Sequence, residues 1–484
     1  MAPRASLIAT LFDPPSNDGA ELTALPQSVD WLEVRADRVG DIDPEWLRNH
    51  FKGRLLYSLG TVDPLNRLER LKTAARFYDR IELDATTDLS EELLRLVRAE
   101  QRLVSWYGSV NELRQLEDRF GQLSSVPAST YKLVVNATTI AEEFLPLSLL
   151  KTLNRTDTIA FSVGPVGFWN RLAALHLGAP AVFARAAGAS LVEMEPTIAK
   201  LIADYGLPQV RQAKQLFAII GNPIFHSLSP RLHNASYRQT DIPALFVPLR
   251  VESFTEFWRE FVLSRKLDAL GMPLNGMTVS SPHKEQAVLT AKMVSGMARQ
   301  TEAANILVRN NGWWVADTTD PDVVYTASRD RSVQVEQKRA AVIGCGGAGR
   351  AIAAALVKSG AGVTLINRGA ERGEHAAALL GLPYIPLRDF DAEGYDIVVN
   401  ATPVGRDTDE VPFQLETLND DAVVIDLVYG SRPTPLVGTT RSRQQLAIDG
   451  RDVLVTQVSH QFRMMTGKEM PVEVFKAVLQ RVAQ

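Results

Sequence analysis

The sequence predicts an α/β protein in which an N-terminal (β/α)8 barrel precedes two further α/β domains. Three observations carry the prediction: eight evenly spaced apolar runs, a change of spacing after residue 208, and a glycine-rich turn between a strand and a helix near residue 344. Strands that alternate with helical patterns are typical of parallel sheets. The predicted boundaries are residues 1–208 for the barrel, 216–325 with 455–484 for the second domain, and 326–454 for the third.

The eight apolar runs of the first domain are predicted to be parallel strands. They start at Ser6, Trp31, Leu55, Arg80, Leu103, Lys132, Thr158 and Ala181, at intervals of 23 to 29 residues. Each interval has room for one helix and two loops, which a crossover between parallel strands requires. Helices are expected at 67–78, 91–100 and 171–177. Eight such units predict a TIM barrel, because open doubly wound sheets seldom contain so many evenly spaced units.

The second and third domains begin at breaks in this pattern. Gly206 and Pro208 end the last helix of the barrel, a linker is expected at 209–215, and a new strand starts at Leu216. A second boundary is expected near 337–341, where a fresh strand leads directly into the glycine-rich turn. Residues 457–484 have a helical pattern.

Composition excludes several classes of protein. Hydrophobic residues make up 45% and charged residues 22% of the 484 residues, as in an ordinary globular protein. Lys and Arg number 52 against 56 Asp and Glu, a formal net charge of −4, so a polybasic nucleic-acid binder is not expected. The one cysteine, Cys345, allows neither an internal disulfide nor a multi-cysteine metal site, and it fits a reducing compartment.

Hydropathy and the N-terminal residues predict a cytoplasmic protein. Asp13 interrupts the first apolar run, which is too short for a signal peptide. Nowhere do 18 apolar residues follow one another, so no membrane span is expected. We therefore expect small-molecule ligands and no metal, membrane or nucleic-acid partner.

The glycine-rich turn predicts a dinucleotide site. Gly344, Gly346 and Gly349 match the pattern G-x-G-x-x-G, with Gly347 inside it, between a predicted strand and an alanine-rich helix. Glycines in this arrangement let backbone N–H groups and a helix N-terminus approach a pyrophosphate. Because both flanks are in place, we expect a bound dinucleotide. Cys345 is expected to be a small filler of the turn.

The next strand favours NADP over NAD. It ends at Asn367 and Arg368, where NAD enzymes usually carry an acidic residue for the ribose hydroxyls, and Arg372 follows one turn later. Guanidinium groups suit the 2′-phosphate of NADP. The alternative is that both arginines are solvated residues at the start of a helix.

A polar string follows the strand at Leu216. Ser227 and Ser229 stand two residues apart before a helix start, so both hydroxyls can face one small anion. Read alone, Ser229 followed by proline is equally a helix N-cap. The whole string, residues 221–234, closely resembles the signature of shikimate dehydrogenases, in which the two serines hold the substrate carboxylate.

Further segments resemble the same family in its order and spacing, from Leu216 to the C-terminus. They are 278–284, 303–305, 319–320, 396–403, 426–435, and Gly450 with Gln457. The resemblance implies a two-lobed dehydrogenase with an α/β substrate domain and a Rossmann NADP-binding domain. It also implies the reversible NADPH-dependent reduction of 3-dehydroshikimate to shikimate, a reaction of the aromatic (shikimate) pathway.

This resemblance implies roles for individual residues. Ketone reduction builds negative charge on oxygen, so Lys284 is the expected proton donor and Asp320 is expected to orient it. Gly450 is expected at the cofactor. The residues expected to hold the substrate are Ser227, Ser229, Ser280, Asn305, Tyr429 and Gln457. Departures from the family pattern at Thr278, Glu302, Ile306 and Thr318 bear on affinity and substrate preference, with quinate as the alternative substrate.

The N-terminal barrel resembles type I 3-dehydroquinate dehydratase, which is known in fusions of this order. The resemblance implies that Lys132 forms a Schiff base with the substrate ketone, which requires an unprotonated amine. It implies that Glu33, Arg35 and Arg171, the last in the loop after the seventh strand, bind the substrate. The structural alternatives are an ordinary ion pair between Glu33 and Arg35, and an exposed Lys132 at a strand start.

Several groups of the dehydratase family are replaced. Tyr107 stands at the place of the proton-relaying histidine, Gly60 at that of a substrate-binding arginine, Ala189 at that of a glutamine and Asp84 at that of a glutamate. Loss of a proton shuttle usually costs about 10²–10⁴-fold, and tyrosine, with an ordinary pKa of about 10, is a poor substitute. We therefore expect weak dehydratase activity at most. Full bifunctionality and a non-catalytic binding scaffold are the alternatives.

Overall fold

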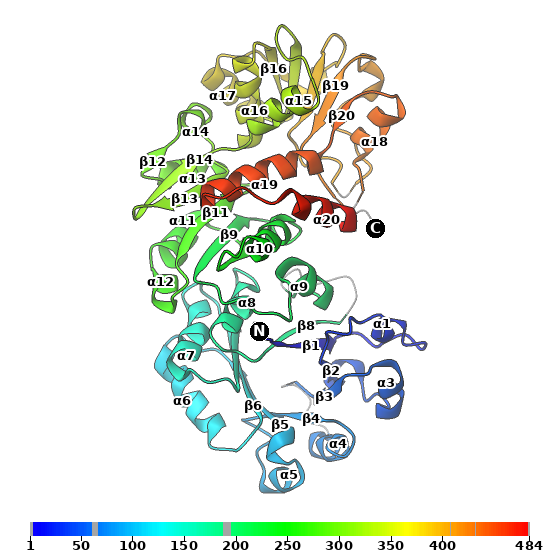
Figure 1. Ribbon diagram of the computed structural model, residues 1–484, viewed down its shortest axis with the longest axis vertical. Coiled ribbons are helices and arrows are strands. Elements are labelled where there is room, and N and C mark those ends of the chain that lie inside the picture. Colours follow the sequence, from blue (N-terminus) through cyan, green and yellow to red (C-terminus); the bar gives the residue numbers. More distant parts are fainter. Residues whose placement is uncertain (1–2, 61–65, 187–194, 407, 431, 483–484) are drawn as a thin grey trace. The chain divides into compact units, whose positions relative to one another are not determined.

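The structure is a computed structural model that describes residues 3–60, 66–186, 195–406, 408–430 and 432–482. It divides into two compact units (Figure 1). The first comprises Met1–Leu216 and Pro223–Leu274, and the second comprises Phe217–Asn222 and Asn275–Gln484. Within the described residues, no helix combines the length and the apolar character needed to cross a bilayer.

Parallel strands form the barrel of the first unit. Their hydrogen-bonded order, β7-β6-β5-β4-β3-β2-β1-β8, leaves β7 and β8 at the two ends of the sheet. Five strands begin at the predicted residue and three begin one or two residues earlier, which confirms the predicted barrel. The strands are β1 (Ser6–Leu11), β2 (Trp31–Arg35), β3 (Arg54–Ser58), β4 (Arg80–Asp84), β5 (Arg102–Gly108), β6 (Thr130–Asn136), β7 (Thr158–Val163) and β8 (Ala181–Arg185).

Helices fill the crossovers between these strands. They are α1 (Ala20–Thr23), α2 (Ala36–Val39), α3 (Pro44–His50), α4 (Arg67–Ala74), α5 (Glu91–Leu96), α6 (Leu113–Ser124), α7 (Leu145–Leu153), α8 (Trp169–His176) and α9 (Ile198–Tyr205), with the short 3₁₀ turns η1 (Ala99–Gln101) and η2 (Glu142–Phe144). Two predicted helices end early. The chain leaves α4 so that Tyr78 packs edge-on against Tyr57, and Val97 has an extended conformation that ends α5.

The core of the barrel comes from alternate residues of its strands, because every second side chain of a strand points inward. Buried apolar residues from seven strands form one cluster: Ile8, Trp31, Leu56, Leu103, Val134, Ile159, Phe161, Ala181 and Phe183. Gly206 ends α9 with a φ of 73°, as predicted from the sequence. The apolar cluster fixes the strands, and polar side chains at their carboxyl ends are left for the mouth of the barrel.

The first unit also contains the segment after the linker, which packs on the barrel. Its elements are α10 (Ser229–Gln239), β10 (Ala244–Arg250), α11 (Phe254–Phe257), η3 (a π-helical turn, Trp258–Val262) and α12 (Lys266–Leu270). Phe261 lies 5.2 Å from Phe144 and 5.0 Å from Trp169, measured between ring centroids. Arg231 Nε donates to Asp204 Oδ1 at 2.7 Å. The linker therefore does not separate the barrel from this segment.

A buried carboxyl group lies beside this aromatic contact. Glu143, in η2, accepts hydrogen bonds from the backbone N–H of Val166 at 2.7 Å, from Trp169 Nε1 at 2.6 Å and from Asn170 Nδ2 at 3.3 Å. Burial raises the pKa of Glu143 to about 7, although these hydrogen bonds and the charge of Arg250 oppose the rise. The folded protein therefore favours the protonated carboxyl at mildly acidic pH.

Replacing Glu143 by Gln is expected to remove a pH dependence of stability, on top of a pH-independent cost because the new NH2 group faces the Val166 or the Trp169 donor. The pKa of Glu143 rises from an ordinary 4.5 to about 7 on folding. Its contribution to stability is thus fully present below pH 4.5 and is lost as the pH rises to 7, by roughly 3 kcal/mol. Thermal unfolding of wild type and Glu143→Gln at pH 5 and pH 8 measures the effect. The exposed Glu100→Gln is the control, and equal shifts in both variants would contradict the assignment.

The second unit contains two sheets, the first of which carries the strand after the linker. In this unit its strands follow the order β9-β11-β13-β14-β12, and β13 is antiparallel to both of its neighbours. The strands are β9 (Gln215–Gly221), β11 (Leu274–Val279), β12 (Met293–Val294), β13 (Ile306–Asn310) and β14 (Trp313–Asp317). The helices are α13 (Lys284–Thr290), α14 (Gly296–Thr301) and α15 (Asp322–Asp330).

The other sheet of the second unit is parallel throughout, in the order β17-β16-β15-β18-β19-β20. Its strands are β15 (Arg339–Ile343), β16 (Gly362–Asn367), β17 (Tyr384–Pro386), β18 (Ile397–Asn400), β19 (Val423–Asp426) and β20 (Ala447–Ile448). The helices are α16 (Gly347–Lys358), α17 (Ala370–Leu380), α18 (Pro435–Ser442), α19 (Gly450–Thr466) and α20 (Val472–Val482), with 3₁₀ turns η4 (Leu387–Asp389) and η5 (Leu415–Thr417). This order is the doubly wound arrangement of dinucleotide-binding sheets.

One helical prediction needs correction. The pattern at 457–484 is two helices rather than one, because Gly467 ends α19 with a φ of 73° and Pro471 precedes α20. The first of them also starts earlier, at Gly450, where the Asp449 carboxylate accepts from the N–H groups of Arg451 and Asp452. The predicted domain boundaries stay a prediction.

Candidate functional site

A buried lysine–aspartate couple occupies the first sheet of the second unit. Lys284 is the first residue of α13, and Asp320 lies between β14 and α15. Lys284 Nζ lies 2.7 Å from Asp320 Oδ2, with 18% of the lysine side chain and 2% of the aspartate side chain exposed. The sequence placed these residues 36 positions apart, and the fold brings their charges together. One face of the ammonium group is thus held, and the partial exposure leaves it open to a ligand.

Amide side chains fix the aspartate in turn. Asp320 Oδ1 accepts from Asn305 Nδ2 at 3.0 Å and from Gln457 Nε2 at 2.8 Å. Asn305 is itself held, because its Oδ1 accepts from the backbone N–H of Thr319 at 2.8 Å. Four of the predicted site residues, Lys284, Asn305, Asp320 and Gln457, therefore form one hydrogen-bonded group. A carboxylate with its lone pairs filled in this way keeps its position.

The glycine-rich turn lies directly against this couple. A Cβ atom on Gly347 would lie 3.1 Å from Lys284 Cβ and 2.8 Å from Ala303 Cβ. Gly344 has a φ of 103°, and a Cβ on Gly349 would lie 1.8 Å from the carbonyl oxygen of Gly344. By contrast, a Cβ on Gly346, the N-cap of α16, would meet nothing within 4 Å. The turn therefore has an open position at a helix N-terminus, which suits a pyrophosphate.

The residues predicted for the adenine-ribose side follow β16. Asn367 Oδ1 accepts from the backbone N–H of Cys345 at 3.1 Å, and Asn367 Nδ2 donates to the Gly369 carbonyl at 2.8 Å. Arg368 and Arg372, the latter in the first turn of α17, are exposed. Asn367 thus holds the glycine turn, and the two arginines remain accessible to a phosphate. Cys345 is buried, which fits a small filler of the turn. Burial raises the pKa of its thiol to about 11.

Other predicted residues of this half occupy the ends of strands and helices. Ser280 follows β11 and is half-buried, as is Tyr429 after β19. Gly450 begins α19 so close to β19 that a Cβ would lie 2.2 Å from the Val428 carbonyl oxygen. A side chain at position 450 would push the helix away from Tyr429.

Ser227 and Ser229 are both buried and belong to the first unit. Ser227 Oγ accepts from the backbone N–H of Ser229 at 3.2 Å. The N-cap of α10 is Leu228, without a side-chain cap, so the alternative of Ser229 as N-cap is wrong. The hydroxyl of Ser229 is therefore not needed to cap the helix. The approach of the two serines to Lys284 stays a prediction.

A further residue, missed in the sequence, joins the turn to its neighbourhood. Arg350, in α16, is 1% exposed and donates to the carbonyl groups of Thr301 and Glu302 and to the Glu285 carboxylate. Glu302, which departs from the family pattern, has a φ of 48°, the left-handed conformation that explains a usual glycine. Its carboxylate lies 3.1 Å from His375 Nε2.

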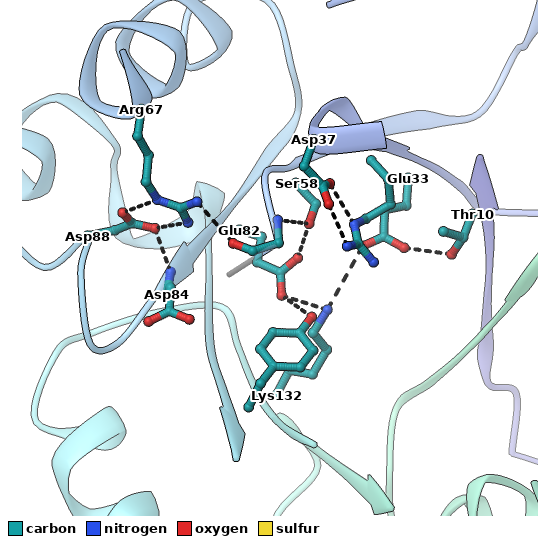
Figure 2. Close-up of polar contacts among 12 residues, drawn as sticks. Thr10, Glu33, Asp37, Ser58, Arg67, Glu82, Asp84, Asp88 and Lys132 are labelled. Carbon is teal, nitrogen blue, oxygen red and sulfur yellow. Dashed lines mark hydrogen bonds and ion pairs between the residues drawn. The ribbon is translucent and has the colours of Figure 1, made fainter. Parts of the chain in front are cut away.

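The barrel of the first unit contains a second group of buried charges, shown in Figure 2. Lys132, on β6, is 3% exposed, and its Nζ lies 2.6 Å from Glu82 Oε1 and 3.9 Å from Glu33 Oε1. The alternative of an exposed Lys132 is therefore wrong. Glu33 Oε2 accepts from Thr10 Oγ1 at 2.6 Å, and Glu82 accepts from Ser58 Oγ. The amine faces inward, as an imine-forming lysine must, but it is held in an ion pair.

The two carboxyl groups around Lys132, those of Glu82 and Glu33, have pKa values shifted in opposite directions. Burial would raise the pKa of Glu82, but the charge of Lys132 and hydrogen bonds from Lys132, Ser58 and Tyr107 lower it to about 2. Burial raises the pKa of Glu33, helped by the charge of Glu82 and opposed by that of Lys132. Glu82 is therefore the ionised partner of Lys132, and Glu33 is the carboxyl that more readily holds a proton.

Tyr107, at the place of the family's histidine, bonds to the same carboxylate. Its hydroxyl donates to Glu82 Oε1 at 2.8 Å, and its ring centroid lies 5.2 Å from Lys132 Nζ. Burial and the nearby charges of Glu82 and Glu33 raise the pKa of Tyr107 well above 10. The phenol therefore keeps its proton at neutral pH.

Arg35 is paired with Asp37 and not with Glu33. Its Nε and Nη2 donate to Asp37 at 2.8 and 2.7 Å, so the alternative of a Glu33–Arg35 pair is wrong. Gly60 lies beside this fork, with a φ of 55°, and a Cβ there would lie 2.7 Å from Arg35 Nη2. The Arg35–Asp37 pair thus fills the space next to the position where the family has an arginine. Ala189 lies outside the described residues.

A second ion pair supports the wall behind Gly60. Arg67 donates to both oxygens of Asp88 at 2.6 Å and to the Gly60 carbonyl at 3.0 Å, and Asp88 Oδ2 accepts from the Asp84 backbone N–H (Figure 2). Asp84, read as a replacement for a glutamate, therefore contributes to a turn. Its Oδ1 accepts from the Thr86 N–H at 2.8 Å.

A cavity of about 340 Å³ opens at the barrel mouth, and its lining includes Thr10, Glu33, Arg35, Gly60, Tyr107 and Lys132. Arg171 lines it as well, but in the first turn of α8 rather than in a loop, which corrects the prediction. Arg171 lies 3.6 Å from Glu195 Oε1 and over the Phe161 ring, and burial lowers its pKa. Arg185, at the end of β8, is a further cation in the lining that the sequence did not single out.

Glu82 is the main residue that the sequence analysis missed in the barrel. A signal was present, because Glu82 stands two residues before Asp84 on β4, and residues two apart share a face of a strand. Its role as partner of Lys132 was not predictable, because β5 lies between the strands of the two residues, β4 and β6, and their contact depends on the folded barrel. Arg185 had the same kind of signal, as a charged residue two positions after the inward-facing Phe183.

A dinucleotide-dependent oxidoreductase is the class of protein that the second unit defines, since a lysine–aspartate couple lies against the glycine turn of a doubly wound sheet. Residues 219–307 match the family model for the shikimate dehydrogenase substrate binding domain. Residues 291–430 match the D-isomer specific 2-hydroxyacid dehydrogenase NAD binding domain, and residues 60–222 match type I 3-dehydroquinase.

Relatives with known names extend these matches. The chain is 36% identical over 268 residues to shikimate dehydrogenase (NADP(+)) of Methanothrix thermoacetophila, covering 55% of this chain and 96% of that protein. This chain belongs to the shikimate dehydrogenase family. It is also 24% identical over 490 residues to the chloroplastic bifunctional 3-dehydroquinate dehydratase/shikimate dehydrogenase of Arabidopsis thaliana, covering 93% of this chain and 80% of that protein.

A solved shikimate dehydrogenase in complex with NADP+ has the same fold as the C-terminal half. The TM-score is 0.50 at 27% identity, over 56% of this chain and 96% of that chain. NADP is named for the Methanothrix relative and for this solved structure, and it is the cofactor predicted from Asn367, Arg368 and Arg372. The chain thus combines an oxidoreductase domain with a lyase domain, the domain content of a bifunctional enzyme.

Proposed function

We propose that the C-terminal half catalyses the reversible NADP-dependent reduction of 3-dehydroshikimate to shikimate. The observation that carries the proposal is the Lys284–Asp320 couple, 2.7 Å apart and set against Gly347. Bound NADPH supplies a hydride to the carbonyl carbon. Lys284 donates a proton from Nζ to the carbonyl oxygen as negative charge develops there, and Asp320 holds the ammonium in place.

The remaining predicted residues are proposed to bind and orient. Ser227 and Ser229 hold the substrate carboxylate, and its hydroxyls are held by Ser280, Asn305, Tyr429 and Gln457. The pyrophosphate would be held by Gly344, Gly346, Gly347 and Gly349, and the 2′-phosphate side by Asn367, Arg368 and Arg372, with Gly450 at the nicotinamide end. The open position at Gly346 and the exposed arginines support this fit.

The proposal is tested by purified protein, shikimate and NADP+, with NADPH formation as the readout. Quinate in place of shikimate tests the alternative substrate. Turnover of quinate but not of shikimate would overturn the substrate assignment, and turnover of neither would overturn the activity. The predicted cytoplasmic location stays a prediction.

Replacing Asp320 by Asn is expected to lower kcat by roughly 10- to 100-fold. The amide keeps the shape but removes the charge that holds Lys284. Its NH2 group would face either the Lys284 ammonium or the donors of Asn305 and Gln457. Steady-state rates with shikimate measure the loss. Asp322→Asn, two residues along the chain and paired with His460, is the matched control. Wild-type rates in Asp320→Asn would remove the residue from the mechanism.

For the barrel, we propose binding of 3-dehydroquinate with weak dehydration at most. The support is the proton-holding Tyr107, the ion pair that Nζ of Lys132 must leave before attacking a ketone, and Gly60 in place of an arginine. Borohydride trapping with 3-dehydroquinate tests this. An adduct on Lys132 with slow dehydration supports the proposal, fast dehydration favours full bifunctionality, and no adduct favours a binding scaffold.

A further inference from the structure

Arg185 is a buried cation at the barrel mouth that neither the sequence motifs nor the proposed function uses. It is the last residue of β8, and 6% of its side chain is exposed. It lines the same cavity as Lys132 and Arg171. In TIM barrels, side chains at the carboxyl ends of strands are those that reach a ligand.

The partners of Arg185 leave its guanidinium incompletely satisfied. Nη2 lies 2.9 Å from Asp13 Oδ2, and the group stacks 5.1 Å from the Phe12 ring centroid. Asp13 is itself 69% exposed, so this partner is largely solvated. Nε is buried and has no hydrogen-bond partner among the residues that the structure describes. A buried donor without a partner is costly, which is a reason to expect a ligand acceptor at this position.

Strand register places Arg185 level with residues of the ligand site. Thr10 on β1 pairs with Arg185 on β8 and with Glu33 on β2. The three side chains therefore lie in one layer of the barrel. Arg171 approaches the same strand, since its Nη1 points to the Phe183 carbonyl at 3.5 Å.

Two other cations of the cavity, Arg35 and Lys132, have carboxylate partners at closer range than the 2.9 Å between Arg185 and Asp13. Arg35 is forked onto Asp37, and Lys132 is paired with Glu82. Arg171 faces Glu195 at 3.6 Å, longer than a direct hydrogen bond. Arg171 and Arg185 are therefore the two cations best placed to receive an anion.

We infer that Arg185, together with Arg171, binds the carboxylate of a hydroxylated cyclic acid in the barrel mouth. Arg185 thereby replaces the substrate-binding arginine of the family, whose position Gly60 occupies in this chain. The inference rests on the proposed binding of such a ligand by the barrel. Space supports it, because a side chain at position 60 would collide with the Arg35–Asp37 pair, whereas Arg185 already lines the cavity. The arginine that is missing at position 60, after β3, is thus replaced by Arg185 at the end of β8.

The concentration dependence of borohydride trapping tests the inference. With 3-dehydroquinate as probe, Arg185→Gln is expected to raise the half-saturating concentration for the Lys132 adduct by roughly 10- to 100-fold, with little change in the maximal rate. Arg185→Lys is expected to recover part of the loss, because it keeps the charge but not Nε.

Arg38→Gln is the matched control. Arg38 lines the same cavity and stacks 5.3 Å from the same Phe12 ring, but it is exposed. Its loss removes one charge from the mouth without removing a buried donor, so a change below about threefold is expected. An equal rise of the half-saturating concentration in Arg38→Gln and Arg185→Gln would overturn the inference. It would indicate that the ligand responds to the net positive charge of the barrel mouth and not to direct contact with Arg185. Unchanged NADP+ reduction with shikimate shows that each variant is folded.

A second measurement does not depend on imine chemistry. The Nε–H signal of Arg185, assigned in nitrogen-15 NMR spectra by its loss in Arg185→Gln, is expected to shift on titration with quinate, which has a carboxylate and no ketone. The uncharged methyl ester of quinate is expected to leave the signal in place. A signal that does not move with quinate overturns the inference.

The two experiments separate this inference from the proposed function. A shifted Arg185 signal without any Lys132 adduct would reject the imine chemistry and keep the role of Arg185. Equal half-saturation in wild type and Arg185→Gln would reject the role of Arg185 and keep the imine chemistry.

Discussion

Replacing Lys284 by Ala is expected to lower kcat for shikimate oxidation by about 10²–10⁴-fold, the usual contribution of a positioned proton-transfer group. The ammonium is the group of the second unit that lies within a hydrogen bond of buried Asp320 and beside the glycine turn. Its removal leaves the developing charge on oxygen without a donor. Since the change acts on the reacting atoms, kcat should fall far more than the KM for shikimate rises.

Lys292→Ala is the matched control for this loss. Lys292 is an exposed lysine of the same unit that stacks on Trp313, so its removal changes the net charge equally. Binding of NADP+ to Lys284→Ala, followed by fluorescence or calorimetry, shows whether the cofactor site is intact. A Lys284→Ala variant that retains more than a tenth of the wild-type kcat would contradict the assignment.

Replacing Tyr107 by His is expected to raise the dehydration rate of 3-dehydroquinate by about 10²–10⁴-fold. The phenol holds its proton because burial and the charges of Glu82 and Glu33 raise its pKa. An imidazole in the same place changes charge near neutral pH and can carry protons between substrate and solvent. The gain should appear in kcat, measured by the ultraviolet absorbance of the enone product.

Tyr107→Phe separates the imidazole from mere loss of the hydroxyl group. It removes the hydrogen bond to Glu82 without adding a proton carrier, so no gain of this size is expected. Adding Lys132→Ala to Tyr107→His should abolish the gain if it proceeds through the imine. A Tyr107→His rate equal to wild type would mean that the missing histidine is not what limits the barrel.

The fold was predictable because its signals are local and periodic. Strand starts such as Ser6, Trp31 and Thr158 follow from apolar runs at even spacing. The glycine turn follows from its motif, in which Gly344 and Gly349 leave no room for a side chain. Helix ends were less predictable, because tertiary contacts such as Tyr57 with Tyr78 decide where α4 stops. The end of α19 at Gly467, inside a stretch predicted as helical, is a second helix end that the sequence pattern did not predict.

The site was predictable where a residue is tied to a motif and not where it depends on pairing. Lys284, Asp320, Asn305 and Gln457 were expected from their segments, and the structure brings them together. Asp37 was missed although it stands only two residues after its partner Arg35. Glu82 was not expected, because its importance arises from a side chain of another strand, Lys132. Arg185 was missed for the same reason.

The aromatic contact of Phe261 with Phe144 and Trp169 has a consequence for how the two activities can be separated. A gene cut at residues 209–215 would expose these rings on both products and strip Asp204 of Arg231. The severed halves are therefore expected to aggregate, even where each retains its own chemistry. The barrel is therefore expected to be required for the solubility of the C-terminal half, whatever its own rate of catalysis.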